Sequence, residues 1–61
     1  MFNEYDIVTT IRPLNNIPLG SRGTVLIVYE ESDEYEVEFV DENGDSMNVV
    51  TVSGVDIKKA E

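Results

Sequence analysis

The stretch that decides the fold is Glu34-Tyr35-Glu36-Val37-Glu38-Phe39, which alternates strictly between acidic and large apolar residues. Alternation with a period of two is typical of a β-strand that has one face on a core and the other in water. The sequence therefore predicts a strand over residues 34–39. Its inward-facing residues are predicted to be Tyr35, Val37 and Phe39.

Two β-compatible runs flank this strand. Before it, Thr24–Tyr29 has apolar residues on both faces, which predicts a strand buried on two sides at the centre of the core. After it, residues 42–45 (Glu-Asn-Gly-Asp) suit a tight type I′ turn, because Asn-Gly tolerates the positive φ angles of that turn. The next run, Ser46–Val52, is then predicted to pair antiparallel with residues 34–39.

The two ends of the chain complete the predicted fold. Asp6–Ile11 is rich in β-branched residues and precedes a proline, so it reads as the first strand. Pro13–Gly23 has the composition of one long loop, and Ser53–Lys58 reads as a tight turn followed by a short last strand. These elements predict an all-β protein: a small five-stranded SH3-like barrel with a long loop after strand 1 and a short turn before the last strand. An OB-type barrel is the alternative, but it usually needs more residues.

Length and composition limit the function classes. The chain has 61 residues, no cysteine and no histidine, so we expect a single SH3-like domain over residues 1–61 that folds without disulfides. Without these side chains a catalytic nucleophile or base has few candidates, and we expect no enzymatic activity, no cofactor and no metal site. Asp41, Asn43 and Asp45 have the spacing that opens a calcium loop, but Gly44 is misplaced and no bidentate glutamate follows. A tight turn explains the same residues.

The net charge of −9 is concentrated in one segment. Acids and bases balance before residue 30 and after residue 45, whereas the segment between has nine acids and no base. These acids are Glu30, Glu31, Asp33, Glu34, Glu36, Glu38, Asp41, Glu42 and Asp45. Such a segment repels nucleic acids and anionic membranes and attracts basic protein surfaces. We therefore expect a protein partner with a basic surface, no nucleic acid and no membrane.

Short motifs along nearly the whole chain resemble one small-domain family. They are Tyr5-Asp6-Ile7-Val8, then Gly20-Ser21-Arg22-Gly23-Thr24-Val25 with Tyr29, then residues 35–39, Gly44, and Val55-Asp56-Ile57. In this order they are similar to the domain-of-unknown-function 4926 family of small SH3-like barrels of bacteria and archaea. The resemblance implies a five-stranded SH3-like barrel without an established biochemical role. Its members resemble small partners encoded beside toxin-like proteins, which implies an immunity or antitoxin role.

The same glycine-bounded turn also resembles the loop of KOW-type domains of ribosomal and transcription factors. In those domains the loops are basic and contact RNA. Here the only bases near the turn are Arg12 and Arg22. This departure argues against RNA binding.

Two functional hypotheses follow. The first is a non-enzymatic protein-binding module, an acidic immunity- or antitoxin-type inhibitor of a basic protein. The second is an accessory or structural subunit of a larger complex, bound through the apolar side chains of the long loop. Some of those side chains are equally expected to cap the open end of the barrel. The candidate partner-binding residues are Glu30, Glu31, Asp33, Glu34, Glu36, Glu38, Asp41, Glu42, Tyr35, Leu14 and Ile17.

The sequence also suggests a location and an assembly state. No segment approaches the ~20 apolar residues that cross a bilayer, and Met1–Asp6 has neither a basic stretch nor an apolar signal region. We therefore expect a cytoplasmic, bacterial-type protein. We also expect a monomer or a weak homodimer, because the strand around Val50 and Val52 has the composition of an edge that can pair with a second chain.

Overall fold

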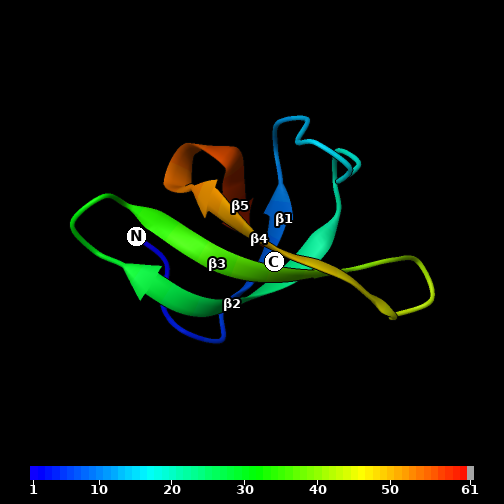
Figure 1. The fold of residues 1–61 in the computed structure, drawn as a ribbon, viewed down its shortest axis with the longest axis horizontal. Coiled ribbons are helices and arrows are strands. Elements are labelled where there is room, and N and C mark those ends of the chain that lie inside the picture. The colour runs from blue at the N-terminus through cyan, green and yellow to red at the C-terminus, as the bar shows by residue number, and fades with distance from the viewer. Residues whose placement is uncertain (61) are drawn as a thin grey trace.

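The computed structural model describes residues 1–60 and shows five antiparallel strands in one bent sheet (Figure 1). The strands are β1 (Ile7–Thr10), β2 (Arg22–Tyr29), β3 (Glu34–Val40), β4 (Ser46–Ser53) and β5 (Ile57–Lys59), with a 3₁₀ helix, η1 (Gly54–Asp56), before β5. The strand order is β4-β3-β2-β1-β5. The predicted all-β class, five strands, long loop and short final turn are confirmed.

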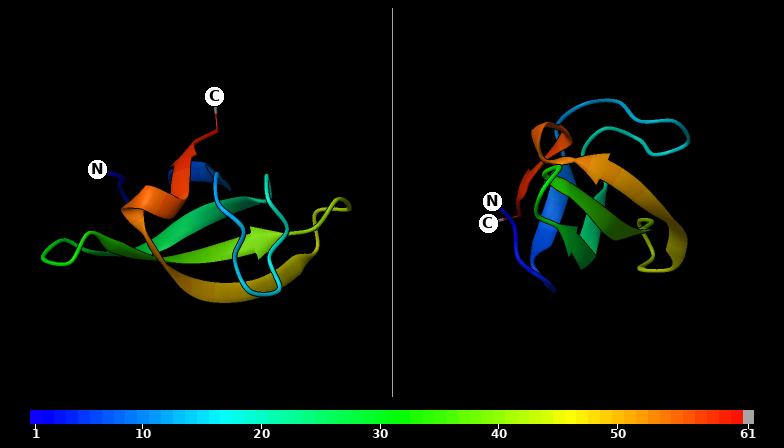
Figure 2. Two further views of the ribbon diagram at one scale, coloured as in Figure 1. Left: turned by 90° about the horizontal axis from the view of Figure 1, so that it is seen from above. Right: turned by 60° about the vertical axis from the view of Figure 1, so that its left-hand side comes forward.

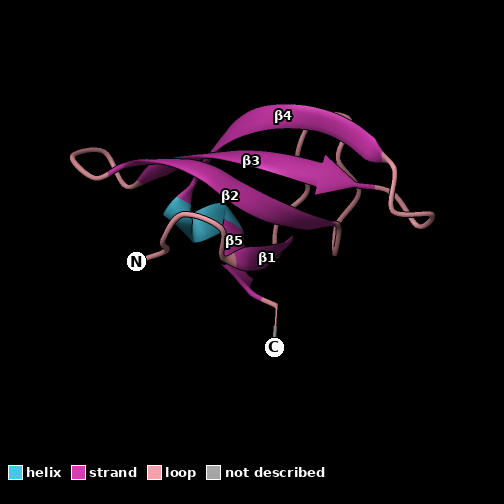
Figure 3. Cartoon of the chain, turned by 90° about the horizontal axis from the view of Figure 1, so that it is seen from below, coloured by secondary structure: helices cyan, strands magenta, loops and turns pink. Residues whose placement is uncertain are grey.

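The sheet is not closed into a barrel, which differs from the expected closure. Its two edges are β4 and β5, and they are joined through η1 rather than by a ladder of hydrogen bonds. Figure 3 shows β2, β3 and β4 curving over β1, β5 and η1. The bend alone brings the inward-facing side chains together, so a core forms without a hydrogen-bonded seam.

The inward face of β3 forms the centre of the core. Tyr35, Val37 and Phe39 are fully buried, which confirms the alternation read from the sequence. Other elements complete the cluster, with Val8, Ile17, Val25, Val52 and Ile57. Burying a side chain of this size stabilises a fold by about 1.5–3 kcal/mol. The core of this small domain therefore depends strongly on one strand.

Burial of β2 on two sides is not what the structure shows. Val25 is fully buried, but Ile27 and Tyr29 are 47% and 40% exposed. The β2–β3 register shifts between Val25 and Ile27, which marks a β-bulge. The sheet is a single layer, so its outer face has no second layer to cover it within residues 1–60. β2 is central in the strand order, yet only one of its faces is buried.

The loop between β1 and β2 is anchored by the buried Thr10. Its hydroxyl accepts hydrogen bonds from the N–H groups of Gly20 (2.8 Å) and Ser21 (3.1 Å) and donates one to the carbonyl of Pro18 (3.2 Å). The loop covers residues 11–21, two residues earlier than the predicted Pro13–Gly23, because β1 already ends at Thr10 and β2 already begins at Arg22.

The turn between β3 and β4 differs from the predicted type I′ turn. Only Gly44 takes a positive φ, of 85°, and the connection is five residues long. The Gly44 N–H donates to the carbonyl of Asp41 (3.0 Å), and the Asp41 carboxylate accepts from the N–H groups of Asn43 (2.9 Å) and Asp45 (3.0 Å). The side chain of Asp41 thus stabilises the turn through hydrogen bonds to its backbone. The Asn-Gly pair alone does not predict this role. The predicted antiparallel pairing of β3 and β4 is confirmed.

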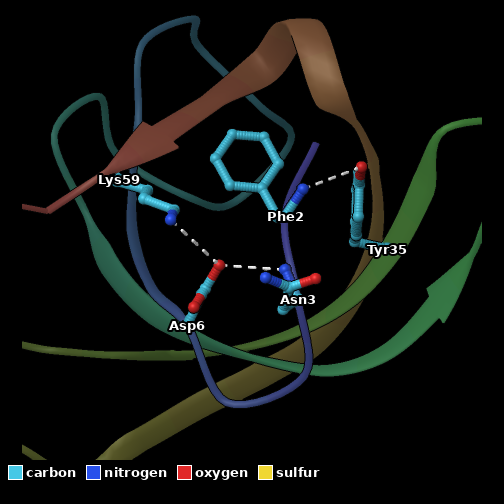
Figure 4. A network of polar contacts seen from close by, with 5 residues as sticks. All are labelled: Phe2, Asn3, Asp6, Tyr35 and Lys59. Carbon is cyan, nitrogen blue, oxygen red and sulfur yellow. Dashed lines mark hydrogen bonds and ion pairs between the residues drawn. The ribbon is translucent and has the colours of Figure 1, made fainter.

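The N-terminal segment folds across the core (Figure 4). The ring of Phe2 packs edge-on against Tyr35 with centroids 5.3 Å apart, and the Phe2 N–H donates to the Tyr35 hydroxyl (3.3 Å). The Asp6 carboxylate accepts from the N–H of Asn3 (2.9 Å) and pairs with the Lys59 ammonium at 3.8 Å. The N-terminal segment is thereby tied to β3 through Tyr35 and to β5 through Lys59. None of the helical residues among 1–60 forms a helix long and apolar enough to cross a membrane.

Candidate protein-binding surface

The outward face of β3 carries a row of three glutamates, Glu34, Glu36 and Glu38. They alternate with the buried residues of the same strand, so the pleat points all three away from the core. The register places a neighbour from β4 beside each of them, with the pairs Glu34–Ser53, Glu36–Thr51 and Glu38–Val49. The row therefore lies in the middle of an open sheet face.

The carboxylate of Glu36 is held in place by its neighbours. One oxygen, Oε2, accepts hydrogen bonds from the hydroxyl of Tyr29 (3.0 Å) and from that of Thr51 (2.8 Å). The hydrogen bond to Glu36 is the largest cause of a raised pKa of Tyr29, followed by desolvation and by the negative charges of Glu36 and Glu34. Glu36 is thus a preorganised negative charge with one oxygen left for another donor.

Further acids extend the row at both ends of β3. The turn from β2 to β3 holds Glu30, Glu31 and Asp33, and the turn from β3 to β4 holds Asp41, Glu42 and Asp45. Figure 2 shows these two hairpin turns at opposite ends of the molecule, whose longest dimension is 32 Å. We call the nine carboxylates of residues 30–45 the acidic strip. It runs the length of the domain.

The acidic strip has no internal counter-charge among the described residues. The one ion pair within residues 1–60 joins Lys59 to Asp6, outside the strip. In the same part of the chain, no group of three or more Asp or Glu side chains is arranged to hold a metal ion. Among the described residues, no carboxylate of the strip is therefore paired with a lysine or arginine.

Two of the predicted contact residues, Asp33 and Tyr35, have structural roles instead. Asp33 takes a positive φ of 53°, its carbonyl accepts from the N–H of Gly54 (2.9 Å), and its carboxylate accepts from the hydroxyl of Tyr35. Tyr35 is fully buried. Its ring therefore lies in the core beside the β2–β3 hairpin and is not accessible to a partner.

The loop candidates also need correction. Ile17 is 2% exposed and belongs to the core, and Leu14 is half-buried against it. Both pack on the core from the β1–β2 loop, and an isolated backbone bridge joins them to each other. Of the apolar residues in this loop, it is Leu19 that is largely exposed, at 63%. Leu19 lies in a shallow depression beside Asp41 and Glu42.

The structure adds apolar residues that the sequence did not single out as contacts. Ile27 and Tyr29 of β2 and Val49 of β4 are exposed on the same face as the glutamate row, and the register places them on either side of it. An open depression of about 550 Å³ lies at the β2–β3 hairpin. Its lining residues include Tyr29, Glu34, Glu36 and Thr51. The exposure of Val49 could have been predicted from the sequence, because the β3–β4 turn places Val49 opposite the outward-facing Glu38.

Together these features define a small all-β domain whose open sheet face combines acidic and apolar side chains. The chain belongs to the family described as domain of unknown function (DUF4926), which matches residues 4–59. No curated protein and no solved structure matches the chain.

Proposed function

We propose that this domain is a non-enzymatic protein-binding module that docks on a basic partner through the acidic strip. Its biological role is that of an immunity- or antitoxin-type inhibitor in a bacterial cytoplasm. The observation that carries the proposal is the uncompensated charge of the strip, whose three central glutamates lie on one sheet face. Like charges held this close repel one another and oppose folding, so a complementary partner would relieve the cost.

The chemistry of the face supports a protein partner in particular. Protein interfaces combine apolar and aromatic residues with a polar rim, and electrostatic complementarity raises the rate of association. Here Ile27, Tyr29 and Val49 provide exposed apolar surface within the acidic face. The Tyr29 ring and the Glu36 carboxylate, which share one depression, suit the ammonium or guanidinium of a partner side chain.

The experiment that tests the proposal is capture of partners by the tagged protein from native lysate at low and moderate salt, followed by binding kinetics with the purified partner. The strip variant is Glu34→Gln, Glu36→Gln and Glu38→Gln combined. A matched control, Asn3→Lys, Asn15→Lys and Val55→Lys, gives the same net charge from exposed sites outside the strip. We expect the strip variant to associate at least about tenfold more slowly and the control to change little. Equal effects of the two variants, or binding insensitive to salt, would contradict the proposal.

A second candidate function is an accessory subunit of a larger complex, bound through apolar contacts. The observation that favours it is the exposure of Leu19 next to the β3–β4 turn. A salt-resistant complex that is lost on Leu19→Ser, but not on the strip variant, would support this function over the first. Leu14 and Ile17 are unsuitable for the test, because both pack on the core.

A further inference from the structure

The strand β4 forms a long sheet edge without a second partner. Within residues 1–60 it pairs with β3 alone, and no backbone hydrogen bond outside that ladder involves residues 46–52. Its eight residues, Ser-Met-Asn-Val-Val-Thr-Val-Ser, include no charge and no proline. Proteins usually protect such edges with short strands or charged side chains.

The other edge of the same sheet shows this protection. β5 has three residues, and two of them are the exposed Lys58 and Lys59. The two edges of one sheet are therefore built differently. The unprotected edge is the one beside the glutamate row, since β4 lies next to β3 in the strand order.

The outward side chains of β4 leave room for long basic side chains from an added strand. These side chains are Val49, Thr51 and Ser53, which lie beside Glu38, Glu36 and Glu34 in the register. Neighbouring strands are about 4.8 Å apart, so an added strand would lie about 10 Å from β3. A lysine or arginine side chain can lay its aliphatic part over the small β4 residues and bring its charge to a glutamate of β3.

We propose that the free edge of β4 accepts an extended segment of the partner as a sixth strand, with lysine or arginine at alternate positions facing the glutamate row. This inference rests on the proposed function and specifies the partner's conformation at the same surface. Backbone hydrogen bonds to β4 supply affinity, and the alternate basic side chains supply selectivity.

The charge of the strip favours a basic segment over a second copy of this chain at the edge. If two β4 edges paired, the two glutamate rows would lie three strand spacings apart, or about 14 Å. This is well within the screening length of about 30 Å at 0.01 M salt, so two strips repel each other there. A segment with lysines at the same edge is attracted instead.

The test uses a labelled synthetic peptide of sequence KVKTKVKT and two N-methylated versions of equal charge. One version carries the methyl groups on the lysines, and the other carries them on the valines and threonines. N-methylation removes backbone donors and blocks one edge of the peptide strand. We expect the unmodified peptide to bind at low salt and to slow amide hydrogen exchange in residues 46–53. At least one methylated version should bind about tenfold or more weakly, the effect of about 1.4 kcal/mol of lost interaction.

The outcomes separate this inference from the proposed function. If both methylated peptides bind as tightly as the parent and the strip variant loses all three, the acidic face binds basic chains without strand addition. The inference then falls and the proposed function stands. Failure of the unmodified peptide to bind at low salt, or protection outside β4, also overturns the inference. Protection of β4 that rises with protein concentration in the absence of peptide would assign the edge to a second copy and overturn it too.

Discussion

The buried hydroxyl of Tyr35 donates a hydrogen bond to the carboxylate of Asp33, which joins the core of the domain to the acidic strip. The same carboxylate lies against Gly54, where an added Cβ would clash with Asp33 Oδ2. The Asp33 carbonyl also accepts from the Gly54 N–H (2.9 Å), so two groups of Asp33 hold the β2–β3 hairpin against the 3₁₀ helix η1. The proposed binding face owes its shape at this end to a core residue.

Removal of the Tyr35 hydroxyl tests this link. Tyr35→Phe keeps the buried ring but deletes the donor to Asp33 and the acceptor for the Phe2 N–H. We expect the free energy of unfolding at pH 7 to fall by about 1 kcal/mol, the net value of a typical hydrogen bond. Urea denaturation measures it. An unchanged midpoint of urea unfolding would show that the Tyr35 hydroxyl does not stabilise the fold through Asp33.

The same residue gives a signature at alkaline pH. Desolvation and the hydrogen bond to Asp33 raise the pKa of Tyr35 above its ordinary value of 10.0. Above pH 10 the unfolded chain therefore loses this proton while the folded chain keeps it, so the unfolded state binds fewer protons and stability falls as pH rises. Tyr35→Phe should lose less stability than the wild type between about pH 10 and 11. The pKa of Tyr29 is raised as well, and Tyr29 is present in both proteins. The effect of Tyr35 is therefore the difference in the free energy of unfolding between variant and wild type at each pH. Parallel curves would contradict the expectation.

Anchoring of the β1–β2 loop by Thr10 is testable with a matched pair of variants. Thr10→Val preserves the buried volume but removes the hydroxyl that bonds Pro18, Gly20 and Ser21. We expect a loss of about 1 kcal/mol in the free energy of unfolding, together with faster amide exchange at Gly20 and Ser21. Thr9→Val is the control, since Thr9 is half-buried on the adjacent position of β1. Equal effects of the two substitutions would show that the loop does not depend on the Thr10 hydroxyl.

Gly23 is predicted to be intolerant of any side chain. A Cβ there would lie 2.6 Å from Val37 Cγ1 and 2.9 Å from the backbone carbonyl oxygen of Glu38. Because a backbone atom cannot rotate away, we expect Gly23→Ala to cost about 3 kcal/mol, the upper part of the range for overpacking. In Gly44→Ala the new methyl meets no neighbour within 4 Å, so only backbone strain of about 1–2 kcal/mol is expected. Thermal unfolding of the two variants ranks them, and the reverse order would refute the close approach of β2 and β3.

The sequence predicted local features well and spatial neighbours poorly. The strict alternation of β3 settled which residues are buried, because a period of two assigns every side chain of a strand to one face. The Thr24–Tyr29 run has no such alternation, so the sequence could not show that Ile27 and Tyr29 lie in solvent. Their exposure follows from the single-layer sheet and the β-bulge, which arise from tertiary packing.

The candidate site was predictable in its charge and not in its apolar part. The acids of residues 30–45 are evident in the sequence, and the placement of Glu34, Glu36 and Glu38 in one row follows from the alternation of β3. Which of Leu14, Ile17 and Leu19 is exposed depends on the path of an irregular loop, and composition does not encode that path. The structure buries Ile17 and exposes Leu19.

The acidic strip is also predicted to keep copies of the domain apart. The uncharged edge of β4 can pair with a second chain, and repulsion between strips opposes that pairing. We expect the wild type to be monomeric at low salt and the combined variant Glu34→Gln, Glu36→Gln and Glu38→Gln to self-associate there. Glu30→Gln, Glu31→Gln and Glu42→Gln combined is the control, since it removes the same charge from the hairpin turns rather than from the row beside β4. Sedimentation velocity at several concentrations measures the association. If the row variant stays monomeric, repulsion between the glutamate rows is not what keeps copies apart. If the control associates equally, net charge rather than position beside the edge accounts for the association.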